Sequence, residues 1–366
     1  MIMKTLSIAL LLASTMAASL PAAAQFNTHR FTASKANEYG LVYSLPNTAL
    51  EITIQTVHTK RVPGEFYNYA RRHLAINDAI TKPSTTVEIG AVDIRTRGVA
   101  NPDNRWTVQF KSGSTPFVIL NQDDIPLAVN TETVAVNEDV ELPEAKAMQP
   151  SILETEIARQ AMTQEMISSS SISKRAKLAA SRIFELRDIR SELLSGQADN
   201  PPADGQAMKL VLDNIAGQEE ALTAMFAGTV QTWTTVRTIT VVPDSLGLDG
   251  KVIARISPFD GVIDADNLAG APVTLSVEVM EMGKLPTNEK GDKKRFPKGG
   301  FAYQIPGTAK VSINYDGREI ASEEVSLAQL GVTFGLDPSL FTDKKAPSQL
   351  RLDPATGGIR LLGPAE

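Results

Sequence analysis

The sequence contains no cysteine. A chain without thiols forms no disulfide, holds no thiolate-ligated metal and uses no cysteine nucleophile. A lipid anchor attached through a cysteine is excluded for the same reason. Histidine is also scarce, with three residues at positions 29, 58 and 73, so few candidates exist for histidine metal sites or histidine bases.

Positive charge is not in excess. The chain has 36 basic and 42 acidic residues, a formal net charge of −6. Binding to nucleic acid requires a clustered basic surface, so we expect no nucleic-acid partner. Downstream of the first 24 residues, no segment has 18 uncharged apolar residues, so we expect no transmembrane segment in the mature chain.

The composition that remains is that of a globular protein. The 366 residues are 42% hydrophobic, 21% charged and 5% aromatic, which argues against a disordered or fibrous chain. At roughly 100–200 residues per domain, this length allows two or three domains.

Residues 1–24 are typical of a secretory signal peptide. Lys4 supplies a positive start, Leu6 to Ala13 an apolar core, and Ala22 to Ala24 a small-residue cleavage site. We therefore expect cleavage between Ala24 and Gln25, and an exported protein. Export without cysteine suits the envelope of a bacterium.

Residues 25–135 are expected to form an N-terminal β-rich module with a short helix. Leu50, Ile52 and Ile54 alternate with polar residues, which indicates a strand with one wet face. The alternation slips by one residue at Gly90, which predicts a β-bulge. Pro63 is placed to start the helix. Residues 136–150 are expected to be an acidic linker.

The periodicity changes to a helical one over residues 151–228. A stripe along the first long helix is apolar except for one charged residue, and comprises Ile172, Ala176, Ala179, Ile183, Leu186, Arg190 and Leu193. A second helix follows the break from Gly196 to Gly205, so we expect an antiparallel helical hairpin. Asp199 and Asp204 lie at its expected tip and are a candidate interaction surface.

Residues 229–366 are expected to form a C-terminal β-rich module. Asp316 and Gly317 match a two-residue type I′ turn, which would place Ile313 opposite Ile320 in a hairpin. A second hairpin is expected around residues 354–358. The predicted fold is therefore α+β, with two β-sandwich-like modules separated by an antiparallel helical hairpin.

Three phrases resemble one protein family: residues 39–46 (YGLVYSLP), residues 63–70 (PGEFYNYA), and residues 195–199 followed by 202–205 (SGQAD, PADG). The family comprises exported proteins of Bacteroidetes and is known as a domain of unknown function. The resemblance would cover nearly the whole mature chain. It implies the periplasm or outer envelope of a Gram-negative bacterium, and it supplies no catalytic or binding residues.

The search for chemical motifs gives weak candidates. No phosphate-binding loop, nucleophile elbow, zinc-protease helix or dinucleotide fingerprint occurs, so we expect no cofactor and identify no catalytic residue. Asp260, Asp264 and Asp266 are spaced as oxygen ligands for calcium, although an inter-strand turn explains them better. His58 and His73 could share a metal if their strand and helix meet, but two hydrogen-bonded structural histidines are the simpler interpretation.

Ser245 is a candidate for O-linked glycosylation. The tripeptide Asp244-Ser245-Leu246 resembles the acceptor used in exported Bacteroidetes proteins, and its neighbours Pro243 and Gly247 favour an exposed turn. Glycosylation would be added after export and would require no binding pocket.

The resulting functional hypothesis is a non-catalytic exported envelope protein that binds or scaffolds an envelope protein or glycan. The alternative is a glycan-active hydrolase that uses two carboxylates, because sequence does not show which distant acidic residues converge. Two carboxyl groups about 5–9.5 Å apart in one deep cleft would favour the enzyme.

Overall fold

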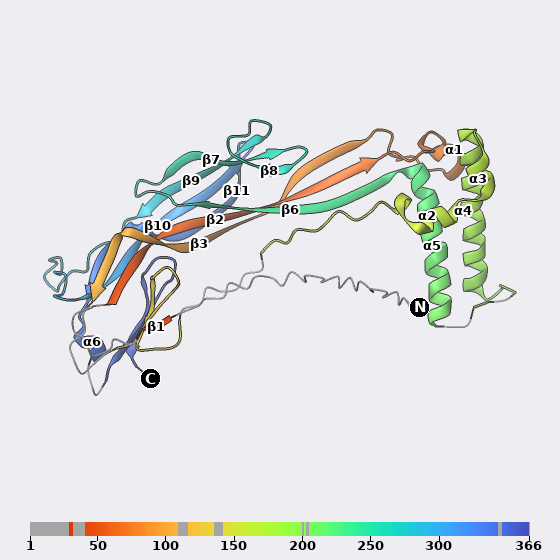
Figure 1. The fold of residues 1–366 in the computed structure, drawn as a ribbon. Helices are drawn as coiled ribbons and strands as arrows, with labels where there is room; N and C mark the ends of the chain where they lie inside the picture. The colour runs from red at the N-terminus through yellow and green to blue at the C-terminus, as the bar shows by residue number, and fades with distance from the viewer. Residues whose placement is uncertain are drawn as a thin grey trace, which may run out of the picture.

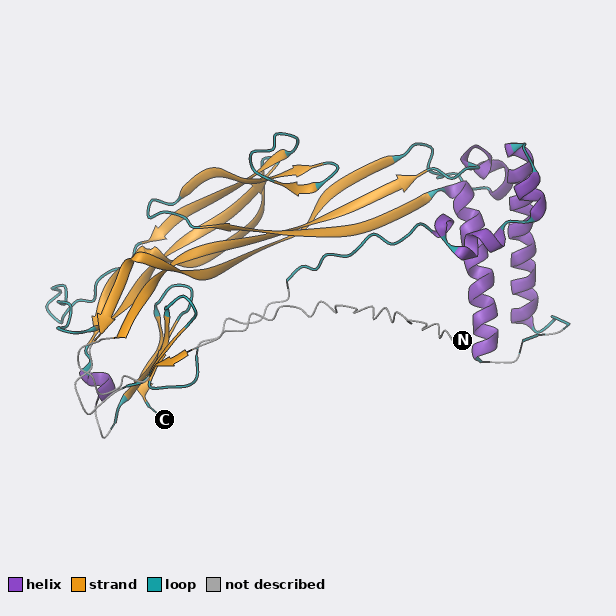
Figure 2. Cartoon of the chain, in the orientation of Figure 1, coloured by secondary structure: helices purple, strands orange, loops and turns teal. Residues whose placement is uncertain are grey.

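The computed structural model describes residues 29–31, 41–108, 116–134, 142–199, 201–202, 205–342 and 346–365. The fold is mixed α and β, as predicted, and the strand pairs found among these residues are antiparallel. The long helices gather at one end of an elongated molecule and the strands make up the rest (Figure 2). Among the described helices, none has the length and apolar character needed to cross a membrane. The predicted signal peptide lies outside the described residues.

Sheet B is a three-stranded ribbon that joins the two ends of the molecule (Figure 1). It contains β2 (Leu41–Val62), β3 (Ser84–Val108) and β6 (Thr229–Val241), in the order β3-β2-β6. All 13 residues of β6 pair with β2, from Val62 opposite Thr229 to Leu50 opposite Val241. Residues 25–135 and 229–366 therefore contribute to the same sheet.

The bulge predicted near Gly90 is confirmed. Gln55 pairs with Ala91 and Thr56 with Ile89, so Gly90 is the extra residue on β3. A Cβ atom at this position would lie 2.8 Å from the Val57 side chain, which is why glycine occupies it.

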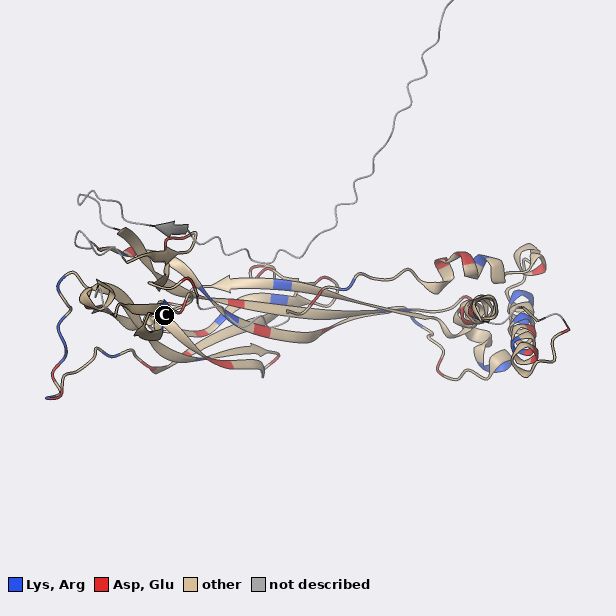
Figure 3. Cartoon of the chain, turned by 90° about the horizontal axis from the view of Figure 1, so that it is seen from below, with Lys and Arg blue, Asp and Glu red and all other residues tan. Residues whose placement is uncertain are grey.

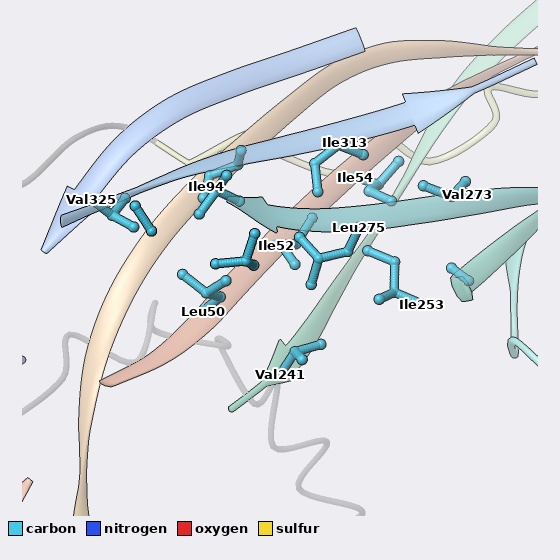
Figure 4. Close-up of a cluster of buried hydrophobic side chains, with 14 of the residues drawn as sticks. Leu50, Ile52, Ile54, Ile94, Val241, Ile253, Val273, Leu275, Ile313 and Val325 are labelled. Carbon is cyan, nitrogen blue, oxygen red and sulfur yellow. The ribbon is translucent and has the colours of Figure 1, made fainter. Parts of the chain in front are cut away.

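Sheet C covers one part of the ribbon. It contains β7 (Leu248–Ser257), β8 (Gly261–Ile263), β9 (Ala271–Glu281), β10 (Phe301–Tyr315) and β11 (Arg318–Leu336), in the order β11-β10-β9-β7-β8. Ile52 and Ile54 of β2 pack in one apolar cluster with Leu275 of β9 and Ile313 of β10 (Figure 4). Alternating apolar residues on β2 therefore form the face that meets sheet C.

Sheet A lies at the end of the molecule opposite the helices. Its strands are β1 (His29–Phe31), β4 (Val118–Leu120), β5 (Pro126–Val129), β12 (Ser348–Leu352) and β13 (Ile359–Pro364), and α6 (Ser339–Thr342) precedes β12. The hairpin predicted around residues 354–358 is confirmed, because Leu352 pairs with Ile359. Because β5 pairs with β12, this sheet also combines residues from the two ends of the sequence.

The predicted turn at Asp316 and Gly317 is confirmed, but the register behind it is wrong. Both residues have positive φ, 50° and 71°, and Tyr315 pairs with Arg318 across the turn. The expected partner of Ile313 was Ile320, whereas Ile313 pairs with Ala321. A bulge at Ile320 shifts the register, and such a bulge follows from no turn rule.

Gly317→Val should lower the free energy of unfolding by about 1–2 kcal/mol, because a β-branched residue is disfavoured at positive φ. Apart from the two neighbouring residues, no atom of the described chain lies within 4 Å of the added Cβ, so the cost comes from the backbone conformation. Lys310→Ala is the control, since it removes a 3.4 Å exposed ion pair with Glu319 that contributes little. Chemical denaturation of both variants tests this, and equal losses would contradict it.

The helical end contains two long helices and several short ones. These are η1 (Tyr67–Tyr69), α1 (Ala70–Leu74), η2 (Ile152–Glu154), α2 (Glu156–Ala161), α3 (Gln164–Ser168), α4 (Ile172–Ser195) and α5 (Gln206–Ala227). The expected helix start at Pro63 is wrong. Gly64 lies against the α5 backbone and Phe66 donates its N–H to Met225 O at 2.7 Å, so the helix starts only at Tyr67.

Helices α4 and α5 lie side by side and share an apolar cluster (Figure 1). Ile183 and Leu186 of α4 are buried in this cluster with Ile215 and Leu222 of α5. Ser171 caps the start of helix α4, where its hydroxyl accepts the N–H of Lys174, and Gly196, with a φ of 71°, caps its end.

Part of the predicted linker lies along the free edge of β6. Residues 135–141 are outside the described chain, and residues 142–150 are extended. Lys146 and Thr234 exchange two backbone hydrogen bonds, of 3.0 and 3.2 Å, as in an added antiparallel strand. Side chains of the ribbon add further bonds: Gln55 Nε2 and Thr234 Oγ1 donate to Glu144 O at 2.9 and 3.0 Å, and Gln231 Nε2 donates to Gln149 O at 2.8 Å.

Candidate functional site

A cavity of about 840 Å³ lies in the corner where α5 leads into β6. Its walls come from three parts of the chain: the segment before η2, the facing sides of α4 and α5, and the first residues of β6. The lining residues are Gln149, Pro150, Ser151, Ile152, Arg187, Arg190, Ala216, Glu219, Glu220, Thr223, Ala224, Ala227, Gly228, Thr229, Val230, Gln231 and Thr232.

Gly228 is the single residue between α5 and β6, and it forms the sharp turn from the helix into the strand. Helix α5 ends there with a φ of 90°, and the Gly228 N–H bonds to Ala224 O at 2.8 Å. A Cβ atom on Gly228 would lie 2.6 Å from Val62 O and 2.9 Å from the Ile80 side chain. Only glycine therefore allows the helix to turn this closely into the ribbon.

One glutamate and two arginines form the charged wall of the cavity. The Glu219 side chain is only 13% exposed. Arg187 Nε donates to its Oε1 atom at 2.7 Å, and Arg190 Nη1 lies 3.0 Å from its Oε2 atom. The second contact lacks hydrogen-bond geometry, and Oε2 is buried without a hydrogen-bond partner in the described chain. Both arginines line the cavity, and the Arg187 guanidinium carbon also lies 5.6 Å from the centre of the Phe184 ring.

The edge of β6 forms the opposite wall. Thr234 directs its backbone groups away from β2, toward Lys146. In an antiparallel ladder, residues two apart direct their backbone groups to the same side, so Thr232 and Val230 also face outward. No backbone hydrogen bond joins either residue to another described segment on that side. The nearby Gln149 is held instead through its carbonyl oxygen, 2.8 Å from Gln231 Nε2.

The polar groups of the cavity can form hydrogen bonds and ion pairs with a ligand. The cavity offers arginine donors, a glutamate acceptor and an unpaired strand edge, and its lining includes no histidine or aromatic residue. The lining hydroxyl of Ser151 accepts the backbone N–H of Leu153 and has no base beside it.

The calcium candidates Asp260, Asp264 and Asp266 lie in the turns on either side of β8. Ser257 Oγ donates to Asp260 Oδ2 at 3.2 Å, and Asp264 forms an ion pair with Arg237. Across the described ranges, no group of three or more histidine, aspartate or glutamate residues could hold a metal ion. Asp260 and Asp264 are therefore each engaged by a neighbouring side chain in these turns.

His58 lies buried in the ribbon where the β7–β8 turn covers it. Its Nε2 atom is 3.1 Å from Thr235 Oγ1 and 3.3 Å from Thr56 Oγ1, and its ring stacks on Trp233. Burial lowers the pKa of His58, and the charge of Asp260 opposes this shift without reversing it. Nδ1 is buried without a partner in the described chain, which favours the tautomer with the proton on Nε2. His73 stacks on a different ring, that of Tyr69, so the two histidines do not share a site.

The lowered pKa of His58 predicts a loss of stability in acid. The unfolded chain takes up a proton at a pKa of about 6.5, before the folded chain does, so the free energy of unfolding should fall as the pH drops below that value. His58→Gln keeps a hydrogen-bonding side chain but does not titrate. Denaturation between pH 8 and pH 5 should show a steeper loss for the native protein than for His58→Gln, and parallel curves would contradict the assignment.

The other predicted positions are exposed or lie outside the described chain. Ser245 is exposed in the turn between β6 and β7, where Asp244 Oδ1 accepts the N–H of Leu246. Asp199 is exposed just beyond α4. Asp204 lies outside the described residues.

One pair of distant carboxylates does converge. Burial, together with the charge of Asp93, raises the pKa of Glu323. Glu323 is nonetheless an exposed residue, and Arg95 holds Asp93 in an ion pair of 2.8 Å. The pair lies away from the cavity lining, so it does not provide the deep cleft that a two-carboxylate hydrolase requires.

Sequence reasoning did not identify the cavity residues. In the sequence, Arg190 stands out only as the residue that interrupts the apolar stripe of α4, and no pattern singles out Glu219. A lone arginine at a core position of a helix is a usable signal, because a charge there requires a partner. That partner is Glu219, from the facing helix.

Comparison with known proteins gives a family but no characterised relative. A family model described as "Domain of unknown function (DUF4831)" matches residues 39–360. No curated protein matches the chain, and no solved structure does.

Proposed function

The chain belongs to the family described as Domain of unknown function (DUF4831), and we propose, from the geometry of the structure, that it is a non-catalytic, exported cell-envelope protein that binds or scaffolds a partner. The partner is a protein of the envelope, and a glycan is the alternative outcome of the test below.

The observation that carries this proposal is the separation of the helices from the main body of strands. Sheets A and C cover one part of sheet B, and β2, β3 and β6 continue beyond them to the helices (Figure 1). An enzyme with one central active site gains nothing from such an extension. Such an extension does benefit a protein that presents a binding surface at a distance from its main body of strands.

The surface that we propose is the end of the helix pair farthest from the ribbon. Leu194 near the end of α4 and Leu210 near the start of α5 are 70% and 71% exposed. Asp199 and Asp204 lie between them in the sequence. Exposed apolar residues within a polar rim are typical of protein interaction sites.

The finer architecture is part of the same proposal. We propose that α4 and α5 act as an antiparallel helical hairpin, which lies in the sequence between strands that form two sandwich-like packings. The apolar cluster between sheets B and C supports the first packing, and the cluster that joins Tyr43, Phe301 and Leu350 from sheets B, C and A supports the second.

The cellular setting is also proposed. Residues 1–24 suit a signal peptide cleaved between Ala24 and Gln25. We propose that the mature chain lies in the periplasm or outer envelope of a Gram-negative bacterium, with Bacteroidetes as the expected group. The mass of the N-terminal peptide from the native host tests this directly. Intact Met1 on most molecules would contradict export.

The binding role is tested by crosslinking and pull-down from the native envelope. Leu194→Ser combined with Leu210→Ser should reduce partner recovery, because it removes the exposed apolar surface without touching the core. Asp199→Ala with Asp204→Ala tests the acidic residues in the sequence between α4 and α5. The leucine pair and Asp199→Ala should not change the melting temperature appreciably, since exposed substitutions alter stability little.

The matched control is Phe259→Ser, which removes an exposed apolar residue (73% exposed) from the β7–β8 turn, far from the helices. Equal recovery for the native protein and both tip variants would contradict the tip as the binding surface. A saccharide that competes away the recovered material would instead identify a glycan ligand.

A further inference from the structure

We propose that the basic loop between β9 and β10, residues 286–298, docks the protein on a lipid bilayer that carries anionic headgroups. This loop projects from the strand-rich end of the molecule, opposite the helices (Figure 3). The inference goes beyond the proposed binding role and does not depend on it, because it concerns the other end of the molecule.

The first support is the charge of the basic loop. It holds two acidic residues, Glu289 and Asp292, against five basic ones: Lys290, Lys293, Lys294, Arg295 and Lys298. Its net charge is therefore +3, whereas the whole chain has a net charge of −6. Near the base of the loop, Asp103, Arg105 and Asp337 together lower the local net charge only to +2. The loop is thus a positive region on an acidic protein, which is what an anionic surface attracts.

The second support is that these positive charges are not neutralised within the protein. All five basic residues of the loop are exposed. None of their side chains makes an ion pair or a hydrogen bond in the part of the chain that the structure describes. The neighbouring Lys284 differs, because its Nζ atom donates to Glu281 Oε1 at 2.7 Å. An anionic partner would therefore bind these cations without first breaking an internal ion pair.

The third support is that the loop has a defined conformation. Asn288 Oδ1 accepts the N–H groups of Lys290 and Asp292, at 2.9 and 2.8 Å, and Lys294 donates its N–H to Pro286 O at 2.8 Å. These bonds fold the loop into a hairpin-like turn that carries the cations. A turn that is already ordered loses little conformational freedom when it binds a surface.

Phe296 holds the base of the loop against the strands. Its ring stacks on Trp106 of β3 with the centroids 5.2 Å apart, and it meets the ring of Phe334 of β11 edge-on at 6.1 Å. Gly335 leaves room for it, since a Cβ atom there would lie 2.7 Å from the Phe296 ring. Phe296 nevertheless remains 39% exposed, next to Arg295 in the sequence. Basic residues beside an exposed aromatic side chain are typical of proteins that rest on a bilayer surface.

The form of the loop favours an extended surface over a small ligand. Sites for small ligands are concave, and this loop contributes no residue to the cavity beside α5. Its cations lie on a projecting turn, where a broad anionic surface can contact several of them at once. A soluble polyanion would interact with the charges alone, whereas a bilayer also offers an apolar region for the exposed part of the Phe296 ring.

The test is cosedimentation of the full mature protein with phosphatidylcholine vesicles, with and without phosphatidylglycerol at about one lipid in three. We expect binding to the anionic vesicles to be at least about tenfold tighter at low salt and to be lost near 0.5 M salt, roughly, because the attraction is electrostatic. No binding to the anionic vesicles, or equal binding to both compositions, would overturn the proposal. Binding to soluble dextran sulfate but not to vesicles would also overturn it, and would identify a polyanion as the partner.

A triple variant tests the charges of the loop. It combines Lys293→Gln, Lys294→Gln and Arg295→Gln, which bring the net charge of the loop to zero. Each cation near an anionic bilayer strengthens binding about fivefold, so the variant should bind the anionic vesicles at least about tenfold more weakly. These side chains are exposed, so the melting temperature should not change appreciably.

The matched control removes the same total charge from exposed positions of α4 and α5, through Lys174→Gln, Lys177→Gln and Lys209→Gln. It should bind the anionic vesicles as the native protein does. Equal weakening by the two triple variants would show that the total charge of the protein matters and the loop does not, and full affinity of the loop variant would overturn the proposal outright.

The absence of cysteine allows the contact to be located with single labels. Thr287→Cys in the loop and Gln197→Cys beyond α4 are both at exposed positions and can each carry an environment-sensitive fluorophore. The emission of the label at position 287 should shift to shorter wavelength on anionic vesicles, and that of the label at position 197 should not. A shift at position 197 alone would place the helices on the bilayer and would contradict docking through the loop.

Discussion

Leu186→Asp should lower the free energy of unfolding by about 3–5 kcal/mol. Leu186 is 2% exposed and lies in the apolar cluster that α4 and α5 share. An aspartate there loses the buried leucine contacts and places a carboxylate where its neighbours are alanine, isoleucine, leucine and methionine side chains. The short helices around this pair bury too little surface to compensate, so the helical end should lose its cooperative packing.

Chemical denaturation followed by circular dichroism at 222 nm measures this loss, because α4 and α5 contribute much of the helical signal. Asp199→Ala is the matched control, since Asp199 is an exposed residue of the same region. If Leu186→Asp lowers the free energy of unfolding by less than about 1 kcal/mol, the charge escapes to water and the interface between α4 and α5 is not tightly packed.

Thr48→Val should lower the free energy of unfolding by about 2–4 kcal/mol while leaving the packing volume almost unchanged. The Thr48 side chain is fully buried on β2. Its hydroxyl donates to Ala355 O at 2.9 Å and accepts the N–H of Ala328 at 2.9 Å. One hydroxyl therefore links sheet B to β11 and to the turn between β12 and β13, and valine would leave two buried backbone groups unpaired.

Thr53→Val provides the comparison. Thr53 is also buried on β2, but its hydroxyl bonds only to the hydroxyl of Thr238, at 2.9 Å. Thr238 is exposed and can bond to water instead, so we expect a loss below about 1 kcal/mol. Equal losses for the two substitutions would show that the link through Thr48 carries no special stability.

Local features of this fold follow from the sequence because local patterns encode them. The slip in alternation at Gly90 corresponds to the bulge, and Asp316-Gly317 to the tight turn, since both depend on a few adjacent residues. Ser171 caps α4 for the same kind of reason. These features need no knowledge of the rest of the chain.

The pairing of distant strands could not be predicted in this way. Strand β6 is more than 160 residues from β2 in the chain, yet the two pair along the whole of β6. Alternation indicates that a strand has one apolar face, but it does not indicate its neighbour. The division into N-terminal and C-terminal β modules rested on chain order, whereas sheets A and B each combine strands from both stretches.

Predicting the cavity from the sequence would have required the same information about which distant segments lie side by side. Arginine and glutamate residues on two different helices met only once the helices were side by side, and the free edge of β6 existed only once β2 had occupied its other side. Charged residues are distributed over many elements of this chain, and the loop at residues 287–299 carries both signs (Figure 3). Charge in the sequence alone therefore did not point to the cavity.

The ribbon also determines how the molecule would respond to a pulling force. The chain passes outward to the helices along β2, returns along β3, and comes back again along β6 after α5. Tension between the helices and the strand-rich end is therefore shared by several continuous backbones, and no hydrogen bond between strands must break for the molecule to bear it. Only a single layer of three strands resists twisting and bending of the ribbon. The three-stranded ribbon should thus be stiff when it is stretched along its length and compliant when it is twisted or bent.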